Sequence, residues 1–94
     1  MKSTFDYKSL EHKLTVAVNH FAEQLKDDER LRDIYELIEQ HGEYGEAYRL
    51  LCYLIDVKQV AISPAMYREL GELGAQMGME DKPWLPLATL TKDA

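Results

Sequence analysis

A line of charged and aromatic residues runs along the most apolar part of this chain. Its members recur at intervals of three and four, which places them on one face of a helix: Glu43, Glu46, Arg49, Tyr53 and Asp56. Carboxylates beside a tyrosine are suited to binding a basic protein surface, with the aromatic ring as the anchor. An ordinary solvated helix face, in which Glu46 pairs with Arg49, explains the same pattern. The residues alone leave both interpretations open and give the solvated face a slight advantage.

The histidines do not suggest a metal or catalytic site. His20 and Glu23 are three residues apart on a predicted helix, but no second pair with metal-ligand spacing accompanies them. We expect His12 on a solvated face and His41 at a helix C-terminus, where an imidazole interacts favourably with the helix dipole. A structural role is therefore the better interpretation of all three.

The glycines do not form a nucleotide site either. Gly71, Gly74 and Gly78 follow a helical spacing and do not follow a strand, so no phosphate-binding loop is present. With Ala75 they form a strip of small residues that could let another helix approach closely, with Gly45 on the opposing side. The sequence also lacks a nucleophile elbow. We expect a protein that is not an enzyme, with no catalytic residues, no metal and no cofactor.

The hydrophobic pattern predicts an all-α fold, a small four-helix bundle-like domain over residues 1–94 with a short C-terminal cap. Apolar residues recur at steps of three and four in four segments. The predicted helices lie near residues 4–26, 28–41, 43–57 and 64–77, followed by an irregular tail over 79–94. The third helix contains the apolar run 50–55, so we expect it to be buried around most of its circumference.

Capping residues mark the ends of these helices. The expected start signals are Ser3 with Asp6, Asp27 or Asp28, and the pair Ser63 and Pro64; the expected stop signals are Gly42 and Gly78. In the tail, Pro83 and Pro86 argue against a long helix. We therefore expect Trp84 to lie across the bundle as a lid.

Composition narrows the possible partners. Seventeen acidic residues against 11 basic ones give a net charge of -6, and the basic residues are not gathered into an arm or a stripe. Nucleic acid is therefore not an expected partner, because neutralising phosphates supplies most non-specific affinity for it. The longest apolar run is too short to span a membrane. An acidic surface instead favours a basic protein partner.

Cysteine usage and the first residues bear on location. Cys52 is the only cysteine and lies within the apolar run, so we expect a buried packing thiol and no intramolecular disulfide. The first residues lack the apolar run of a signal peptide. We expect a cytoplasmic protein, with a monomer as the simplest state and the oligomeric state left open.

Two segments, 39–55 and 62–79, together resemble the MafI family of immunity proteins of contact-dependent growth inhibition systems. The first carries an acidic helix start of the form H-G-E-Y-G-x-A, and the second carries a serine-proline helix that ends in M-G. The matching residues are His41, Gly42, Glu43, Tyr44, Gly45 and Ala47, then Ser63, Pro64, Tyr67, Leu70, Leu73, Met77 and Gly78. The resemblance covers roughly the second half of the chain.

The resemblance implies an all-helical immunity protein that binds and neutralises a cognate toxin C-terminal domain. Many toxins of such systems are nucleases, often ribonucleases, whose active sites are basic because they hold phosphates. The toxin-binding residues expected from helix geometry are Glu43, Glu46, Arg49, Tyr53 and Asp56, with Glu36 and Glu39 as possible neighbours. Whether such binding blocks the active site or another surface is left open.

The alternative is a helical adaptor or transcriptional regulator that acts through protein-protein contacts. A helix-turn-helix DNA-binding protein is a weaker third possibility. The joint between the predicted helices 28–41 and 43–57 is short, as in that motif. The would-be recognition helix, however, begins with Glu43 and Glu46, which phosphates would repel.

Overall fold

The computed structural model describes residues 6–91, which contain four α-helices and one 3-10 helix. These are α1 (Tyr7–Leu25), α2 (Arg30–Glu39), α3 (Tyr44–Val57), α4 (Pro64–Gln76) and the 3-10 helix η1 (Leu85–Leu90). Within this part of the chain the β pairing consists of one isolated bridge between Ile62 and Thr91. The predicted all-α fold with a short C-terminal cap is confirmed.

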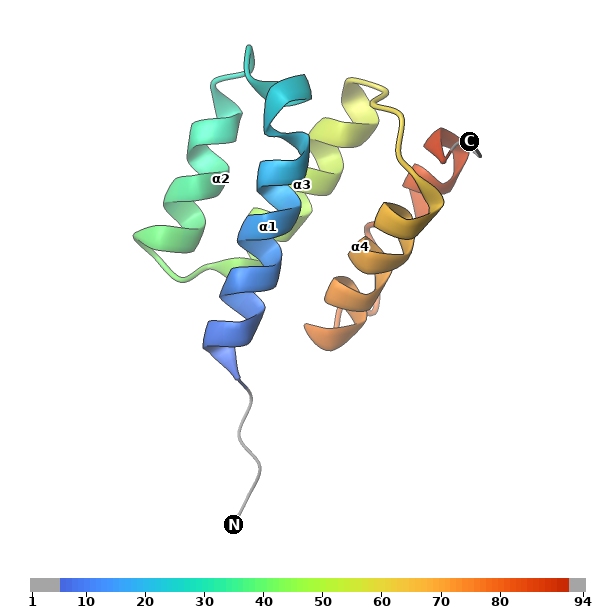
Figure 1. Ribbon diagram of the computed structural model, residues 1–94. Helices are drawn as coiled ribbons and strands as arrows, with labels where there is room; N and C mark the ends of the chain where they lie inside the picture. The colour runs from blue at the N-terminus through green and yellow to red at the C-terminus, as the bar shows by residue number, and fades with distance from the viewer. Residues whose placement is uncertain (1–5, 92–94) are drawn as a thin grey trace.

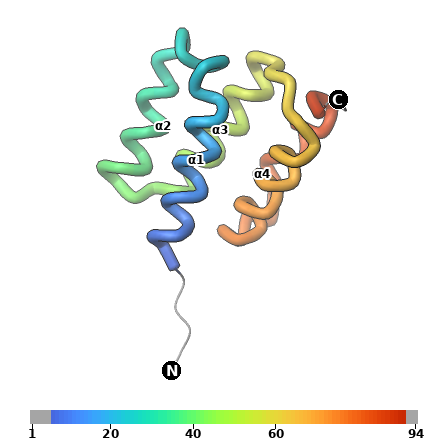
Figure 2. Tube along the Cα trace, viewed as in Figure 1, coloured from blue at the N-terminus to red at the C-terminus, as the bar shows by residue number. Residues whose placement is uncertain are grey.

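The four α-helices run alternately up and down (Figure 1). α2 and α4 lie on the outside, α1 and α3 lie between them, and η1 returns beside α4 (Figures 1 and 2). This order places the start of α1, the start of α3 and the end of α4 at the same end of the bundle. Residues far apart in the sequence therefore meet there.

α3 supplies much of the core. It makes close backbone contacts with α1, α2 and η1. Its buried side chains are Ala47, Tyr48, Leu51, Cys52, Leu54 and Ile55. Because these positions cover most of the helix circumference, the polar residues of α3 are confined to a narrow face, as the sequence predicted.

The helix starts depend on carboxylate and hydroxyl caps. Asp6 accepts a hydrogen bond from the backbone N–H of Ser9 at 3.1 Å and caps α1, whereas Ser3 lies outside the described residues. The N-cap position of α2 is Glu29, not Asp27 or Asp28, and the side chain of Glu29 makes no capping hydrogen bond, so α2 begins two residues later than predicted. Asp28 still accepts a hydrogen bond from the backbone N–H of Arg30 at 2.9 Å. Ser63 caps α4 as expected, because its hydroxyl accepts from Met66 N–H at 3.1 Å.

Two glycines end helices in the left-handed conformation, as predicted. Gly42 after α2 has φ of 62° and Gly78 after α4 has φ of 72°, values that favour glycine because a Cβ would be strained there. The N–H of Glu43 donates to the carbonyl of Leu37 at 2.8 Å, and that of Met79 to the carbonyl of Gly74 at 3.0 Å. These bonds fix the direction in which the chain leaves each helix.

The tail is more regular than predicted, because residues 85–90 form a 3-10 helix. Pro86 is tolerated there, since the first turn of a helix needs no N–H from it. Leu87 and Leu90 are three residues apart, which places both on the same side of a 3-10 helix, and both are buried. The N–H of Ile62 donates to the carbonyl of Leu90 at 3.0 Å and joins the tail to the start of α4.

Two glycines of α4, Gly71 and Gly74, face Trp84, and Gly74 also approaches Tyr48 of α3. A Cβ added at Gly74 would overlap the indole of Trp84 and come within 2.8 Å of the Tyr48 hydroxyl. A Cβ at Gly71 would lie 3.1 Å from Trp84 Nε1. Gly45 was expected to oppose these glycines, but its neighbour is Met79, whose Cε would be 3.2 Å from an added Cβ. Trp84 thus packs across α4 as a lid.

Candidate partner-binding surface

The polar line of α3 begins just before the helix and extends to its last turn. Glu43 is the N-cap residue, although its side chain makes no capping hydrogen bond, and Glu46 lies in the first turn. Glu43, Glu46, Arg49 and Tyr53 are exposed and Asp56 is half-buried. These residues span about 20 Å of helix axis. All five predicted positions are therefore presented along one side of α3.

Arg49 does not pair with Glu46 as the sequence suggested. Its guanidinium holds the carboxylate of Asp81 with two hydrogen bonds, one of them 3.0 Å from Nη2 to Oδ1. This pairing raises the pKa of Arg49, and the nearby Glu46 adds a smaller electrostatic contribution. Asp81 follows α4, so the ion pair connects the middle of α3 to the turn after α4. Glu46 is left to face solvent.

The C-terminal half of the line has a different character, because two basic residues approach it. The guanidinium of Arg30 lies over the ring of Tyr53, with Cζ 5.6 Å from the ring centroid. Arg30 also bonds Asp28, at 3.0 Å from Nε and 2.8 Å from Nη2, and Lys58 approaches the same carboxylate at 3.3 Å. Tyr53 remains 53% exposed. This half is therefore a mixed-charge cluster with an accessible aromatic ring.

The N-terminal half forms an acidic hollow with the turn after α4. The hollow has a volume of about 600 Å³. Its charged lining residues are Glu43, Glu46, Glu80, Asp81 and Arg49, which is four carboxylates against one guanidinium, or a formal charge of -3. Because that guanidinium is already paired with Asp81, the hollow offers an excess of carboxylate oxygens to a cation.

The predicted neighbours on α2 do not join this hollow. Glu36 and Glu39 are exposed. Glu39 helps to raise the pKa of Tyr35, whose burial is the larger cause. The Tyr35 hydroxyl bonds Asn19 of α1 at 2.5 Å, so Glu39 lies on the side of α2 that faces α1. The α2 residue that reaches the polar line of α3 is Arg30.

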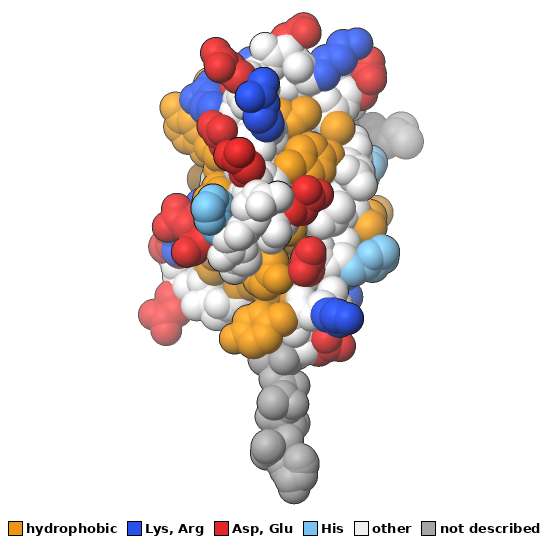
Figure 3. Space-filling view, turned by 90° about the vertical axis from the view of Figure 1, so that its left-hand side faces the viewer, with side chains coloured by type: hydrophobic (Ala, Val, Ile, Leu, Met, Phe, Trp, Pro, Cys, Tyr) orange, Lys and Arg blue, Asp and Glu red, His pale blue; other side chains and the backbone are white. Residues whose placement is uncertain are grey.

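Charges of both signs are interspersed on the face that shows α2. Acidic side chains are spread over this face, and basic side chains gather mainly near its upper end, where α1 turns into α2 (Figure 3). A helix face of this kind is usual for a solvated surface. The concentration of carboxylates in the hollow is a different arrangement.

Sequence reasoning missed Glu80 and Asp81. Both follow the stop signal at Gly78, where a solvated turn is the ordinary expectation. Their spacing in the sequence does not relate them to Glu46 and Arg49, because the two segments come together only in the folded chain, where Arg49 binds Asp81. The one available signal was two adjacent acidic residues placed two and three positions after a helix-ending glycine.

The histidines and the cysteine show no arrangement suited to metal binding or catalysis within residues 6–91. His12, His20 and His41 are exposed, and no group of three or more histidine, cysteine, aspartate or glutamate side chains among residues 6–91 is arranged to hold a metal. Burial raises the pKa of the Cys52 thiol to about 12. Such a thiol is neutral at physiological pH and is a poor nucleophile.

Comparisons with known proteins add no relative. The chain matched no protein-family model, no curated protein and no solved structure. Within the described residues, none of the helices combines the length and apolar character needed to cross a bilayer.

Proposed function

We propose that this protein is an immunity protein that binds and neutralises a cognate bacterial toxin domain. Its partner is a basic domain, most simply a nuclease or ribonuclease of a contact-dependent growth inhibition system. The protein acts as a stoichiometric inhibitor in the cytoplasm of the producing cell and not as an enzyme. The proposal extends the resemblance of segments 39–55 and 62–79 to the MafI family.

The acidic hollow is the observation that carries this proposal. Nuclease active sites hold phosphates with lysine and arginine, so a surface that presents carboxylates competes for the same cations. Glu43 is the N-cap residue of α3 and Glu46 lies in its first turn, and this helix is buried on its other sides, which holds both residues on a rigid support. Glu80 and Asp81 complete the hollow from the turn after α4, which the Arg49 ion pair connects to α3.

The mixed-charge cluster supplies a second contact. Tyr53 is exposed enough to lie against a partner, and tyrosine is among the residues that most often dominate protein interfaces. Its ring already has the Arg30 guanidinium over it, so less new area is available than the sequence alone suggested. We therefore assign the larger electrostatic contribution to the hollow and a supporting contact to Tyr53.

Co-expression tests this function directly. The chain is produced together with the toxin-like domain encoded by an adjacent gene, and bacterial growth and complex formation are both measured. Recovery of growth with a stoichiometric complex supports the proposal. A toxic neighbour that neither binds nor is neutralised contradicts it, and a complex that forms at a promoter instead favours a regulator.

A further inference from the structure

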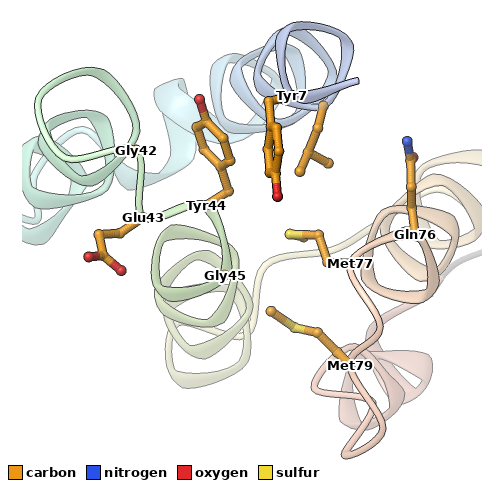
Figure 4. A pocket seen from close by; sticks show the side chains of 9 residues that line it. Tyr7, Gly42, Glu43, Tyr44, Gly45, Gln76, Met77 and Met79 are labelled. Atoms are coloured by element: carbon orange, nitrogen blue, oxygen red, sulfur yellow. The ribbon is translucent and has the colours of Figure 1, made fainter. Parts of the chain in front are cut away.

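A second pocket, with a larger share of apolar and aromatic side chains in its lining, adjoins the acidic hollow. It has a volume of about 410 Å³ and lies between the starts of α1 and α3 and the end of α4. Figure 4 shows Met77 and Met79 pointing from the end of α4 toward α3. The ring of Tyr7 extends from α1 toward Met77. Leu10 and Tyr44 complete the apolar lining.

The pocket and the hollow share a wall. Glu43, Gly45, Met77 and Met79 line both. The carboxylate of Glu43 points away from the methionine side chains (Figure 4). Met79 separates the two spaces, because its methyl group lies against Gly45. A cation in the hollow and an apolar group in the pocket would therefore be neighbours.

One side of this pocket is fixed and the other is adaptable. Tyr44 is half-buried and its hydroxyl donates to Glu11 Oε1 at 3.0 Å, which holds the ring against α1 and raises the pKa of Tyr44. Met77 and Met79 are half-buried, unbranched and flexible, a property that suits irregular binding surfaces. Tyr7 is 62% exposed, and its ring lies beside that of Tyr44 with the ring centroids 6.3 Å apart. An incoming side chain can thus be accommodated by methionine rotation.

We propose that this methionine pocket receives an apolar side chain from a partner segment that also carries lysine or arginine. The apolar group enters between Met77, Met79 and Tyr7, and the neighbouring cation enters the hollow beside Glu46 and Glu80. The charge of the hollow selects this occupant, because an acidic or neutral segment leaves its carboxylates unmatched. As a statement about the toxin, the inference rests on the proposed function.

Three short peptides test the pocket without any toxin. The probe is acetyl-Gly-Lys-Leu-Lys-Gly-amide; one control replaces leucine by glycine and the other replaces both lysines by glutamate. The methionine methyl groups are labelled with ¹³C and followed by NMR at low salt. Met77 and Met79 report on the pocket, and the buried Met66 is the internal control.

The lysine-leucine peptide is expected to shift the Met77 and Met79 methyl signals and leave Met66 unchanged. The glycine control should bind at least about tenfold more weakly, because it has no apolar side chain to bury. The glutamate control should produce no shift. Equal binding of the lysine-leucine and glycine peptides, or binding of the glutamate peptide, overturns the proposal.

Two variants separate this inference from the proposed function. Met79→Ser removes the adaptable wall and Glu80→Lys reverses a charge of the hollow; each should abolish the peptide-induced shifts, with folding checked by circular dichroism. If the toxin binds but the peptides do not, the pocket inference fails and the immunity function stands. If the peptides bind as expected and the toxin does not, the proposed function fails.

Other occupants give distinct results that overturn the proposal. Signals of Met77 and Met79 that move when residues 1–5 are deleted, with no peptide effect, indicate that the chain covers its own pocket. Signals that move with protein concentration alone indicate a second copy. Either result excludes the basic partner segment as the occupant.

Discussion

Arg49 of α3 is bound by two hydrogen bonds to Asp81, which lies beyond the end of α4. The ion pair connects two segments 32 residues apart in the sequence. It also satisfies the guanidinium within the chain, so the adjacent Glu43, Glu46 and Glu80 keep their charges available. The sequence suggests that the charges of Glu46 and Arg49 cancel in the polar line of α3. Because Arg49 pairs with Asp81 instead, the N-terminal half of this line is acidic.

Charge reversal in the hollow should weaken the binding of a basic partner. Glu46→Lys is expected to lower affinity by about tenfold or more at low salt, with the loss mainly in the association rate, because opposite potentials steer encounter. Tyr53→Ala should have a smaller effect. Surface plasmon resonance at several salt concentrations measures both. Glu36→Lys is the matched control, since it makes the same charge change outside the hollow, and an equal effect there contradicts the assignment.

Substitution of Gly74 should destabilise the fold in spite of the helix propensity of alanine. Alanine in a helix is favoured over glycine by about 1 kcal/mol. At Gly74 the added methyl overlaps Trp84 and the Tyr48 hydroxyl, so Gly74→Ala should cost about 1–3 kcal/mol net. Denaturant unfolding monitored by Trp84 fluorescence measures the change.

Gly71→Ala is the informative comparison for this steric argument. Its methyl meets the edge of the same indole at 3.1 Å, which a small shift of Trp84 can relieve. The cost should be less than that of Gly74→Ala. Equal stability of the two variants would show that Trp84 does not determine the requirement for glycine.

Removal of the Tyr48 hydroxyl should cost about 1 kcal/mol, the usual value for a buried hydrogen bond. This hydroxyl donates to the carbonyl of Leu70 at 2.5 Å and links α3 to α4. Tyr48→Phe keeps the buried ring and removes only the bond. Tyr53→Phe, at an exposed ring of α3, is the control and should leave the free energy of unfolding almost unchanged. A larger loss of unfolding free energy for Tyr53→Phe than for Tyr48→Phe would contradict the placement of these rings.

Asp28 should make stability depend on pH in the acid range. Hydrogen bonds from Arg30 hold the pKa of this carboxyl well below its ordinary value of 3.8, and Lys58 adds a smaller lowering. The unfolded chain therefore takes up the proton first, so this stabilisation is present above about pH 4 and is lost as the pH falls further. Asp28→Asn retains a capping oxygen but removes the charge.

The melting temperatures of the native chain and Asp28→Asn should differ most near neutral pH and converge in acid. Thermal unfolding followed at a series of pH values measures the difference. Asp27→Asn changes an exposed neighbouring residue and should not produce the same pattern. A difference for Asp28→Asn that is constant with pH would exclude a contribution from its ionisation.

Cys52 should be nearly inert in the native protein. Its side chain is buried in α3 and its pKa is raised to about 12, so the thiolate is scarce and inaccessible. Reaction with a disulfide reagent near pH 8 is expected to be on the order of a thousandfold slower than in the denatured chain, because it requires opening of the core. Rapid modification in the native state would contradict the packing of α3.

Much of this fold follows from local sequence signals. The apolar spacing defines four helices, and Ser63, Gly42 and Gly78 mark ends that the structure confirms. The start of α2 differs from the prediction because Glu29 occupies the N-cap position, while Asp28 accepts the N–H of Arg30 from one residue further back. Pro83 and Pro86 argue against a long helix, but Pro86 lies in the first turn of η1, where a short 3-10 helix tolerates it.

Only part of the candidate surface could be predicted from the sequence. Helix periodicity places Glu43, Glu46 and Tyr53 on one face, since that depends on the geometry of a single helix. The approach of Asp81 to Arg49 and of Arg30 to Tyr53 depends on how separate helices pack. For the same reason the sequence suggested Glu36 and Glu39 as neighbours, whereas the structure turns Glu39 toward α1.

Co-expression with the adjacent toxin-like domain, comparing the native chain with Glu46→Lys, is the most direct test of the central claim. The native chain is predicted to restore growth and co-purify in a stoichiometric complex, and the folded variant to lose protection when its expression is limited. Full protection by a double variant that carries both Glu46→Lys and Glu80→Lys would show that the acidic hollow does not bind the toxin.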